Sequence, residues 1–345
     1  MSEASSQMMS SGQLGFGFED AAAGTLPPAL RKARKSGPVA VQPQTPEPEA
    51  MARLLEAHPD YRVLRRLPVQ LRFAHQPTGP VTRVLILDTE TTGLYHARDR
   101  IIELALLAVD VETATGLPTG EVEVYNALED PGMPISKEVQ GITGINDEMV
   151  RGHRLDEQRV ASMLLKADLV LAHNAGFDRP FVEARMAQFS RLPWACSFAD
   201  LDWKKEGRSS AKLSQLALEL GWFYDAHRAE MDCHALLAVL ACQLPLSGHT
   251  GLAGLLAVSV RTSYRLQATA APFEAKDLLR ARGYRWDADI KVWQIKLGDE
   301  NSLRAECQWL KTSVYAGRSA RVQLEQFDAS SRYSARPGIV TLQAL

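Results

Sequence analysis

Residues 84–94 read Val-Leu-Ile-Leu-Asp-Thr-Glu-Thr-Thr-Gly-Leu. The first four residues form an uninterrupted apolar run, which predicts a strand buried on both faces of a sheet. Asp88 and Glu90 follow, and side chains two apart on a strand point the same way, so both carboxylates emerge on one side of the sheet. Hard divalent cations would relieve the repulsion between them. In the simpler alternative, Asp88 ends the strand and Glu90 points into water.

A third carboxylate follows another buried strand. The apolar run Leu169–Ala172 leads into His-Asn-Ala-Gly-Phe-Asp, which ends at Asp178. Asp178 has the position of a helix N-cap, with Pro180 in the first turn. A turn from strand to helix on the same sheet is also where a third carboxylate can join the first two. The pattern alone leaves both interpretations open.

The last chemical cluster is His-Arg-Ala-Glu-Met-Asp, from His227 to Asp232. It opens an apolar helix, which puts His227 just ahead of the helix and Asp232 in its early turns, where an acid also suits the helix dipole. Histidine is the side chain best suited to accept a proton near neutral pH. A surface histidine is the simpler alternative for this cluster taken alone.

The elements around these clusters alternate in type. Strands are predicted at Ile101–Val109 and Glu121–Leu128, with a short one at Trp194–Ser197, and helices at Lys212–Leu220 and Ala229–Leu240. Three strands in a meander, followed by alternating helices and strands, predict an α/β fold with a mixed central sheet flanked by helices. This is the arrangement of the ribonuclease H-like fold.

Together the three clusters resemble the motifs of the DnaQ-like (DEDDh) 3′→5′ exonucleases, in the right order and over about residues 83–245. The resemblance implies that Asp88, Glu90, Asp178 and Asp232 bind two divalent cations, Mg²⁺ or Mn²⁺, and that His227 is the general base. It also implies nucleic-acid contacts from six further residues: Thr89, Thr91, Gly93, Leu94, Asn174 and Phe177.

Residue composition and the breaks in the apolar pattern along the chain predict four segments. Residues 1–50 are rich in Ser, Gly, Ala, Gln and Pro and are expected to be a disordered tail. Residues 51–80, helical as far as Leu71, are expected to pack on the exonuclease domain at 81–246. Residues 255–330 predict a small accessory α+β domain with the element order βαββαβ.

Charge is distributed unevenly. Residues 1–80 carry 9 basic and 7 acidic residues (+2), residues 81–245 carry 16 and 25 (−9), and residues 246–345 carry 14 and 9 (+5). Bound cations would explain part of the central acidity. No apolar run is long enough for a membrane span, and the four scattered cysteines fit a reduced cytoplasm.

Two further contacts are predicted outside the motifs. Tyr284, Arg285, Trp286 and Lys291 form a possible accessory-domain surface for stacking and phosphate binding, and the alternative is that these aromatics fill the domain core. Near the N-terminus, four residues resemble the short peptides that dock on bacterial sliding clamps: Gln13, Leu14, Phe16 and Phe18.

The sequence therefore predicts a metal-dependent 3′→5′ exonuclease that releases nucleoside 5′-monophosphates from nucleic acid 3′ ends, with DNA favoured by a resemblance to the epsilon proofreading subunit of DNA polymerase III. A sliding clamp or a polymerase is a possible partner, and proofreading, repair and DNA processing are all open as roles. Two alternatives remain: an RNA-trimming exoribonuclease, and a nucleic-acid-binding scaffold with a vestigial site.

Overall fold

Strand β3 (Val81–Thr91) is the one that the apolar run predicted, and Val84, Leu85, Ile86 and Leu87 are each 0% exposed. The computed structural model describes residues 47–345. β3 lies within a six-stranded sheet of order β2-β5-β4-β3-β6-β7, antiparallel to β4 and parallel to β6. The other strands are β2 (Arg72–Phe73), β4 (Ile101–Glu112), β5 (Pro118–Leu128), β6 (Leu169–Ala172) and β7 (Trp194–Cys196).

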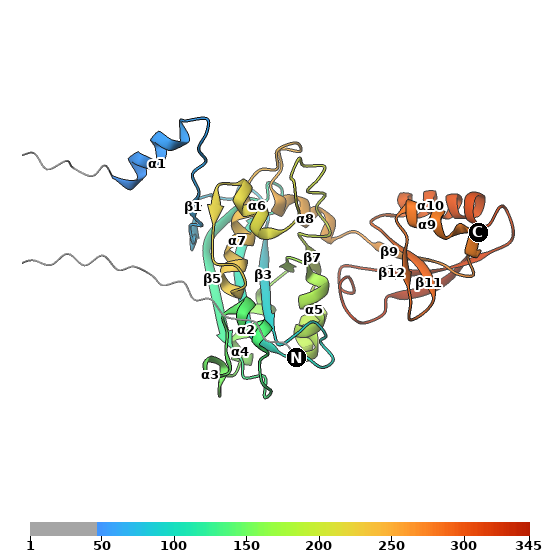
Figure 1. The fold of residues 1–345 in the computed structure, drawn as a ribbon, viewed down its shortest axis with the longest axis horizontal. Coiled ribbons are helices and arrows are strands. Elements are labelled where there is room, and N and C mark those ends of the chain that lie inside the picture. Colours follow the sequence, from blue (N-terminus) through green and yellow to red (C-terminus); the bar gives the residue numbers. More distant parts are fainter. Residues whose placement is uncertain (1–46) are drawn as a thin grey trace, which may run out of the picture. The chain divides into compact units, whose positions relative to one another are not determined.

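Helices pack on both faces of this sheet (Figure 1). Val84 and Ile86 face the core formed with α6 (Leu213–Glu219), α7 (Ala229–Ala241) and α8 (Gly251–Ser259). Leu85 and Leu87 face the opposite core, formed with α4 (Glu157–Lys166) and α5 (Ala175–Arg185). Shorter helices complete the domain: α2 (Lys137–Thr143), α3 (Asp147–Val150) and a 3₁₀ turn at Ala187–Arg191. The predicted mixed sheet flanked by helices is confirmed.

The segment before β3 differs from its prediction. Helix α1 (Pro48–Glu56) ends well before Leu71, because Pro59 cannot continue a helix and disfavours helical backbone in the residue before it. The chain then runs extended. β1 (Arg65–Arg66) pairs with β8 (Trp222–Phe223), and β2 pairs with β5.

The predicted tail up to residue 46 and the predicted clamp peptide (Gln13, Leu14, Phe16 and Phe18) lie outside the described residues. Within residues 47–345, no helix combines the length and the apolar character needed to cross a membrane.

The last part of the chain forms a separate antiparallel sheet of order β10-β11-β9-β12-β13. Its strands are β9 (Ser263–Ala268), β10 (Arg285–Asp287), β11 (Val292–Leu297), β12 (Arg321–Phe327) and β13 (Ile339–Ala344). Helices α9 (Lys276–Arg282) and α10 (Glu300–Trp309) lie on one face of it (Figure 1) and bury Leu279, Leu303 and Cys307 against the sheet. A 3₁₀ turn (Phe273–Ala275) precedes α9, and a π-helical turn (Leu310–Val314) follows α10.

The predicted limits of this accessory domain, 255 and 330, differ from the structure in two ways. Residue 255 lies inside α8, whose Leu252 and Leu255 are fully buried in the core of the first sheet. The domain also continues past residue 330 into β13, which the sequence analysis missed. Its residues are all exposed at the edge of the sheet, so no buried face marks the strand.

Between β12 and β13, residues 328–336 form a segment, here called the strap, that binds α5. Arg179 on α5 is 0% exposed and donates hydrogen bonds to the backbone carbonyls of Ser330 and Arg332 in the strap. Its Nε also donates to Glu183 over 2.7 Å. Arg332 in turn pairs with Asp200 just after β7. The helix that carries Asp178 is therefore tied to the C-terminal part of the chain.

We expect Arg179→Met to destabilise the protein by about 3–5 kcal/mol, because it removes the buried partner of Glu183 and the donor to the carbonyl of Arg332. The carbonyl of Ser330 loses one of its two donors and keeps Arg336 at 3.0 Å. Urea unfolding in EDTA measures this change. Arg191→Met, at an exposed arginine of the same domain, is the matched control and should stay within about 0.5 kcal/mol of the parent. Equal midpoints for the two variants would show that the strap contact contributes nothing.

Candidate active site

A cavity of about 660 Å³ gathers the five predicted chemical residues, which come from β3, α5, α7 and the turn before α7. Three of the predicted nucleic-acid contacts, Thr89, Asn174 and Phe177, line the same cavity. The five predicted metal-binding and catalytic residues are Asp88, Glu90, Asp178, His227 and Asp232. Side chains that are distant in the sequence thus share one cavity beside the sheet.

Three of the carboxylates form a close group. Asp88 and Glu90 have the same parity along β3 as Val84 and Ile86, so they point to the α7 side of the sheet, where Asp232 occupies the first turn of α7. One carboxylate oxygen from each of Asp88, Glu90 and Asp232 lies within 4.8 Å of the others. Closely grouped carboxylate oxygens are the ligands that hard divalent cations prefer.

The electrostatics of this group favour a bound cation. Burial and the neighbouring acids, Asp178 first, raise the pKa of Asp88 well above its ordinary value. Burial, followed by the charge of Asp232, raises the pKa of Glu90 to about 8. The pKa of Asp232 is also raised, mainly by burial. Without a bound cation, ionising these buried carboxylates costs free energy. Their chemistry therefore fits a site for divalent cations.

Asp178 reaches the cavity from α5, on the other face of β3. It is 2% exposed and accepts hydrogen bonds from the backbone N–H and the hydroxyl of Thr89, at 3.1 and 2.8 Å. Thr89 has the opposite parity to Asp88, so its side chain points toward α5. Asp178 lies outside the 4.8 Å group, and burial raises its pKa to about 7.

The predicted N-cap role of Asp178 is wrong. The helix begins at Ala175, with Asn174 as its N-cap residue, and Asp178 is the fourth residue inside it. Asn174 has a left-handed φ of 74°, which asparagine tolerates better than most residues, so the chain turns into the helix earlier than expected. The carboxylate of Asp178 consequently accepts hydrogen bonds from Thr89 and does not cap the helix.

His227 lies in the turn before α7, as predicted. Its φ is +65°, a conformation that is uncommon for residues other than glycine, and its side chain is exposed at the cavity. The backbone N–H groups of His227 and Arg228 both donate to Oδ2 of Asp232, at 2.8 and 3.2 Å. Oδ1 of Asp232 accepts from the hydroxyl of Tyr224 over 2.9 Å. The carboxylate therefore also holds the turn that carries the histidine.

Glu103 is a supporting residue that the sequence analysis missed. It is 0% exposed on β4, directly opposite Glu90, and accepts from the guanidinium of Arg228 and the backbone N–H of Ala229. These bonds fix the start of α7 against the sheet. One signal was present in the sequence, since an acid inside an apolar strand requires a buried partner.

Other missed residues line the cavity. His173 contacts the hydroxyl of Ser197 over 2.7 Å, and burial lowers its pKa to about 4, so it is neutral near pH 7. Phe198 is 47% exposed and packs edge-on against His173, at 5.7 Å between ring centroids. Lys212 adds a cation. His173 opens the His-Asn-Ala-Gly-Phe-Asp motif but was given no role there, and Phe198 and Lys212 lie outside the three motifs.

Three predicted nucleic-acid contacts, Thr91, Gly93 and Leu94, do not line the cavity. Thr91 is buried, and its hydroxyl donates to the carbonyl of Gly93 over 2.6 Å. A Cβ atom at Gly93 would lie 2.6 Å from the carboxylate of Asp99, so this glycine permits a close packing contact. Leu94 is 74% exposed. A contact between these residues and nucleic acid stays a prediction.

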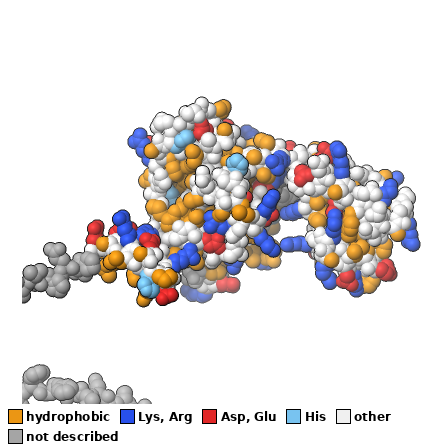
Figure 2. All heavy atoms as spheres, turned by 90° about the horizontal axis from the view of Figure 1, so that it is seen from above, with side chains coloured by type: hydrophobic (Ala, Val, Ile, Leu, Met, Phe, Trp, Pro, Cys, Tyr) orange, Lys and Arg blue, Asp and Glu red, His pale blue; other side chains and the backbone are white. Residues whose placement is uncertain are grey.

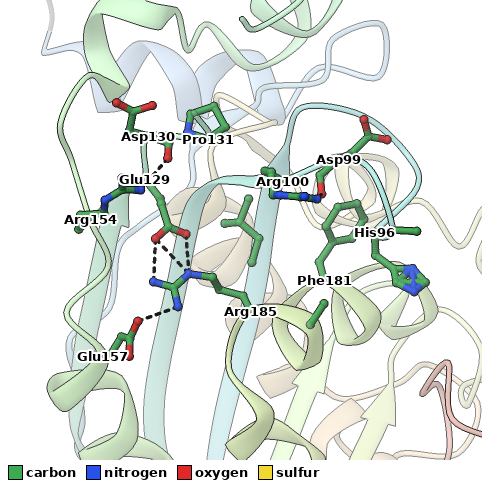
Figure 3. Close-up of a pocket in the computed structure, with 13 residues that line it drawn as sticks. His96, Asp99, Arg100, Glu129, Asp130, Pro131, Arg154, Glu157, Phe181 and Arg185 are labelled. Atoms are coloured by element: carbon green, nitrogen blue, oxygen red, sulfur yellow. Dashed lines mark hydrogen bonds and ion pairs between the residues drawn. The ribbon is translucent and has the colours of Figure 1, made fainter. Parts of the chain in front are cut away.

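A larger cavity, of about 840 Å³, lies elsewhere in the same domain (Figure 3). Two of its acidic side chains, Glu129 and Glu157, form ion pairs with Arg185, and Arg154 donates to the backbone carbonyl of Asp130. It lacks a close group of carboxylates like the one at Asp88. The chemistry is therefore assigned to the smaller cavity.

Comparison with known proteins agrees with this geometry. Residues 85–240 match the RNase_T family model, described as Exonuclease. The chain is 29% identical over 166 residues to the DNA polymerase III subunit epsilon of Treponema pallidum, covering 46% of this chain and 74% of that protein. Residues 85–240 therefore form an RNase T/DnaQ-like exonuclease domain with distant homology to the epsilon subunit.

A second relative is the PolC-type DNA polymerase III of Thermotoga maritima, with 33% identity over 119 residues, or 34% of this chain and 8% of that protein. Among solved structures, exonuclease X in complex with 5′ overhanging duplex DNA is 22% identical, with a TM-score of 0.35 over 49% of this chain and 99% of that one. Exonuclease I is 21% identical, with a TM-score of 0.38 over 53% of this chain and 48% of that one.

We expect Mg²⁺ or Mn²⁺ at about 100 times its dissociation constant to raise the melting temperature by roughly 5–10 °C over that in EDTA. Asp88→Asn removes a ligand and also a buried repulsion. This variant should therefore melt in EDTA at the parent temperature or above, and gain little from the metal. Differential scanning calorimetry measures both effects. A full metal-dependent shift in the variant would contradict the assignment of the ligands.

Proposed function

We propose that this chain, whose residues 85–240 form a DnaQ-like exonuclease domain, is a metal-dependent 3′→5′ exonuclease that releases nucleoside 5′-monophosphates, from DNA in the first instance. One observation carries the proposal: four carboxylates from three elements line one cavity with His227. Asp88, Glu90, Asp178 and Asp232 would hold two divalent cations. Cations of this kind activate water and stabilise the charge on the leaving 3′-oxygen.

The residues of the chain account for the remaining requirements. His227, exposed at the cavity, accepts the proton of the attacking water. Asp232 holds the backbone of the histidine turn, and Glu103 holds the start of α7 behind it. The rings of Phe177 and Phe198 line the cavity and offer apolar faces to the terminal base and sugar. Together these groups position a 3′ end for hydrolysis.

The choice of DNA rests on the relatives, which are named as the epsilon subunit of DNA polymerase III and as a PolC-type DNA polymerase III. Joint action with a polymerase or a sliding clamp remains a prediction, because the match to epsilon covers 46% of the chain and the peptide at Gln13 lies outside the described residues. A vestigial site is disfavoured, because every carboxylate and the histidine are present in one cavity.

We expect Asp88→Asn and Asp178→Asn to abolish cleavage while the protein stays folded, and His227→Ala to slow it about 10²- to 10⁴-fold. Release of mononucleotides from a 3′-labelled single strand in Mg²⁺ measures the rates. Asp225→Asn is the matched control, because this exposed carboxylate lies two residues from His227 and does not line the cavity. A normal rate for Asp88→Asn, or for the parent protein in EDTA, would overturn the proposal.

The same assay distinguishes the substrates. Single-stranded DNA, a duplex with a 3′ mismatch and RNA of the same sequence are compared in Mg²⁺ and in Mn²⁺. Faster degradation of the DNA substrates is expected. Faster degradation of RNA would instead favour the RNA-trimming alternative, and no cleavage of any substrate would favour the binding scaffold.

A further inference from the structure

The accessory domain has a pocket of its own, of about 410 Å³. We name it the aromatic-basic pocket after the residues that define it: Phe273, Lys276, Arg280, Trp286, Lys291 and Trp293. No aspartate or glutamate is among its lining residues. On the face of the molecule seen in Figure 2, hydrophobic side chains of this domain stand among Lys and Arg side chains. The pocket therefore combines apolar rings with positive charge.

The β10–β11 hairpin places two of the rings side by side. Trp286 and Trp293 are directly opposite each other in the antiparallel pair, with ring centroids 5.6 Å apart and planes inclined at 59°. Trp293 packs partly against the domain core, whereas Trp286 is 50% exposed. Phe273, at the start of the turn before α9, is 75% exposed. Two large rings therefore face solvent, although burial would stabilise the fold more.

The sequence left two alternatives for these residues, a nucleic-acid-binding surface or the domain core, and each alternative holds for different residues. Tyr284, predicted as a possible contact, is 2% exposed in the domain core, so that prediction is wrong for Tyr284. It precedes β10 and packs under α10, where its ring is 6.2 Å from that of Trp309. Arg285 is exposed but does not line the pocket. Trp286 and Lys291 do line it.

The cations stand next to the rings. Nζ of Lys276 lies 4.3 Å from the ring centroid of Phe273, and the guanidinium of Arg280 lies 5.9 Å from that of Trp293. Lys291 is exposed at the hairpin turn with a left-handed φ of 53°. Within residues 47–345, neither Lys276 nor Lys291 has an ion-pair partner, and Arg280 has only the exposed Asp277 at 3.4 Å. The positive charge is therefore available to a ligand.

We propose that the aromatic-basic pocket binds single-stranded nucleic acid, with a base stacked on Trp286 and phosphates neutralised by Lys276, Arg280 and Lys291. Aromatic faces among cations are the combination that binds unpaired bases and their phosphates. An acidic peptide would satisfy the cations but would leave the rings without a planar partner. The idea that this strand is also the substrate rests on the proposed exonuclease function, whereas the binding itself does not.

Binding is measured on the full chain in EDTA, which stops cleavage, by the fluorescence anisotropy of a labelled oligothymidylate. Trp286→Ala should weaken binding about 5- to 150-fold, the loss of one stacked base, and Trp286→Phe should restore part of it. Lys276→Ala and Lys291→Ala should each lower the salt dependence of log Kd by about one unit. Tyr61→Ala, at an exposed ring 57% accessible and outside both cavities, should bind normally.

Three results would overturn the proposal: unchanged binding in Trp286→Ala with its melting temperature preserved, equal affinity for blunt duplex and single strand, or equal competition by an acidic peptide. Cleavage separates this proposal from the first one. Asp88→Asn should bind the oligonucleotide normally. Trp286→Ala should still hydrolyse a dinucleotide, because a dinucleotide in the cavity of Asp88 is too short to reach the aromatic-basic pocket as well. Binding that depends on Trp286 in a chain without nuclease activity would support the pocket and refute the exonuclease.

Discussion

Repulsion among carboxylates that meet at the end of the buried strand β3 is the constraint on which the rest of the site depends. The apolar run of β3 ends at Leu87, and the next side chains, Asp88 and Glu90, enter a cavity that also receives Asp178 and Asp232. Burial and mutual charge raise the pKa values of these groups, so the protein alone does not favour their ionised forms. A pair of divalent cations bound there would compensate both effects.

The surrounding structure holds these acids in place despite the repulsion. Thr89 bonds to Asp178 from one face of β3, and on the other face buried Glu103 fixes the start of α7. The strap extends this support, because Arg179, the residue after Asp178, is anchored to backbone carbonyls from the end of the chain. The C-terminal part of the chain is therefore bonded to the helix that carries Asp178, and it also contains the pocket proposed above to bind nucleic acid.

The sequence predicts elements whose burial leaves a regular pattern. β3 and β6 are buried on both faces and appear as apolar runs, and the turn at His227 precedes an apolar helix, so each was located closely. The predicted start of α5 was wrong because the local sequence does not reveal that Asn174 adopts a left-handed backbone conformation. Glu103 and the strap depend on contacts between residues more than a hundred positions apart, which no local pattern encodes.

The central claim is that carboxylates from β3, α5 and α7 bind divalent cations in one cavity. Anomalous scattering from crystals of the full chain soaked in Mn²⁺ tests it most directly. The account predicts strong anomalous peaks among the oxygens of Asp88, Glu90 and Asp232, with Asp178 at the same site. Crystals that show no peak in this cavity at saturating Mn²⁺, or carboxylates that point away from one another, would contradict it.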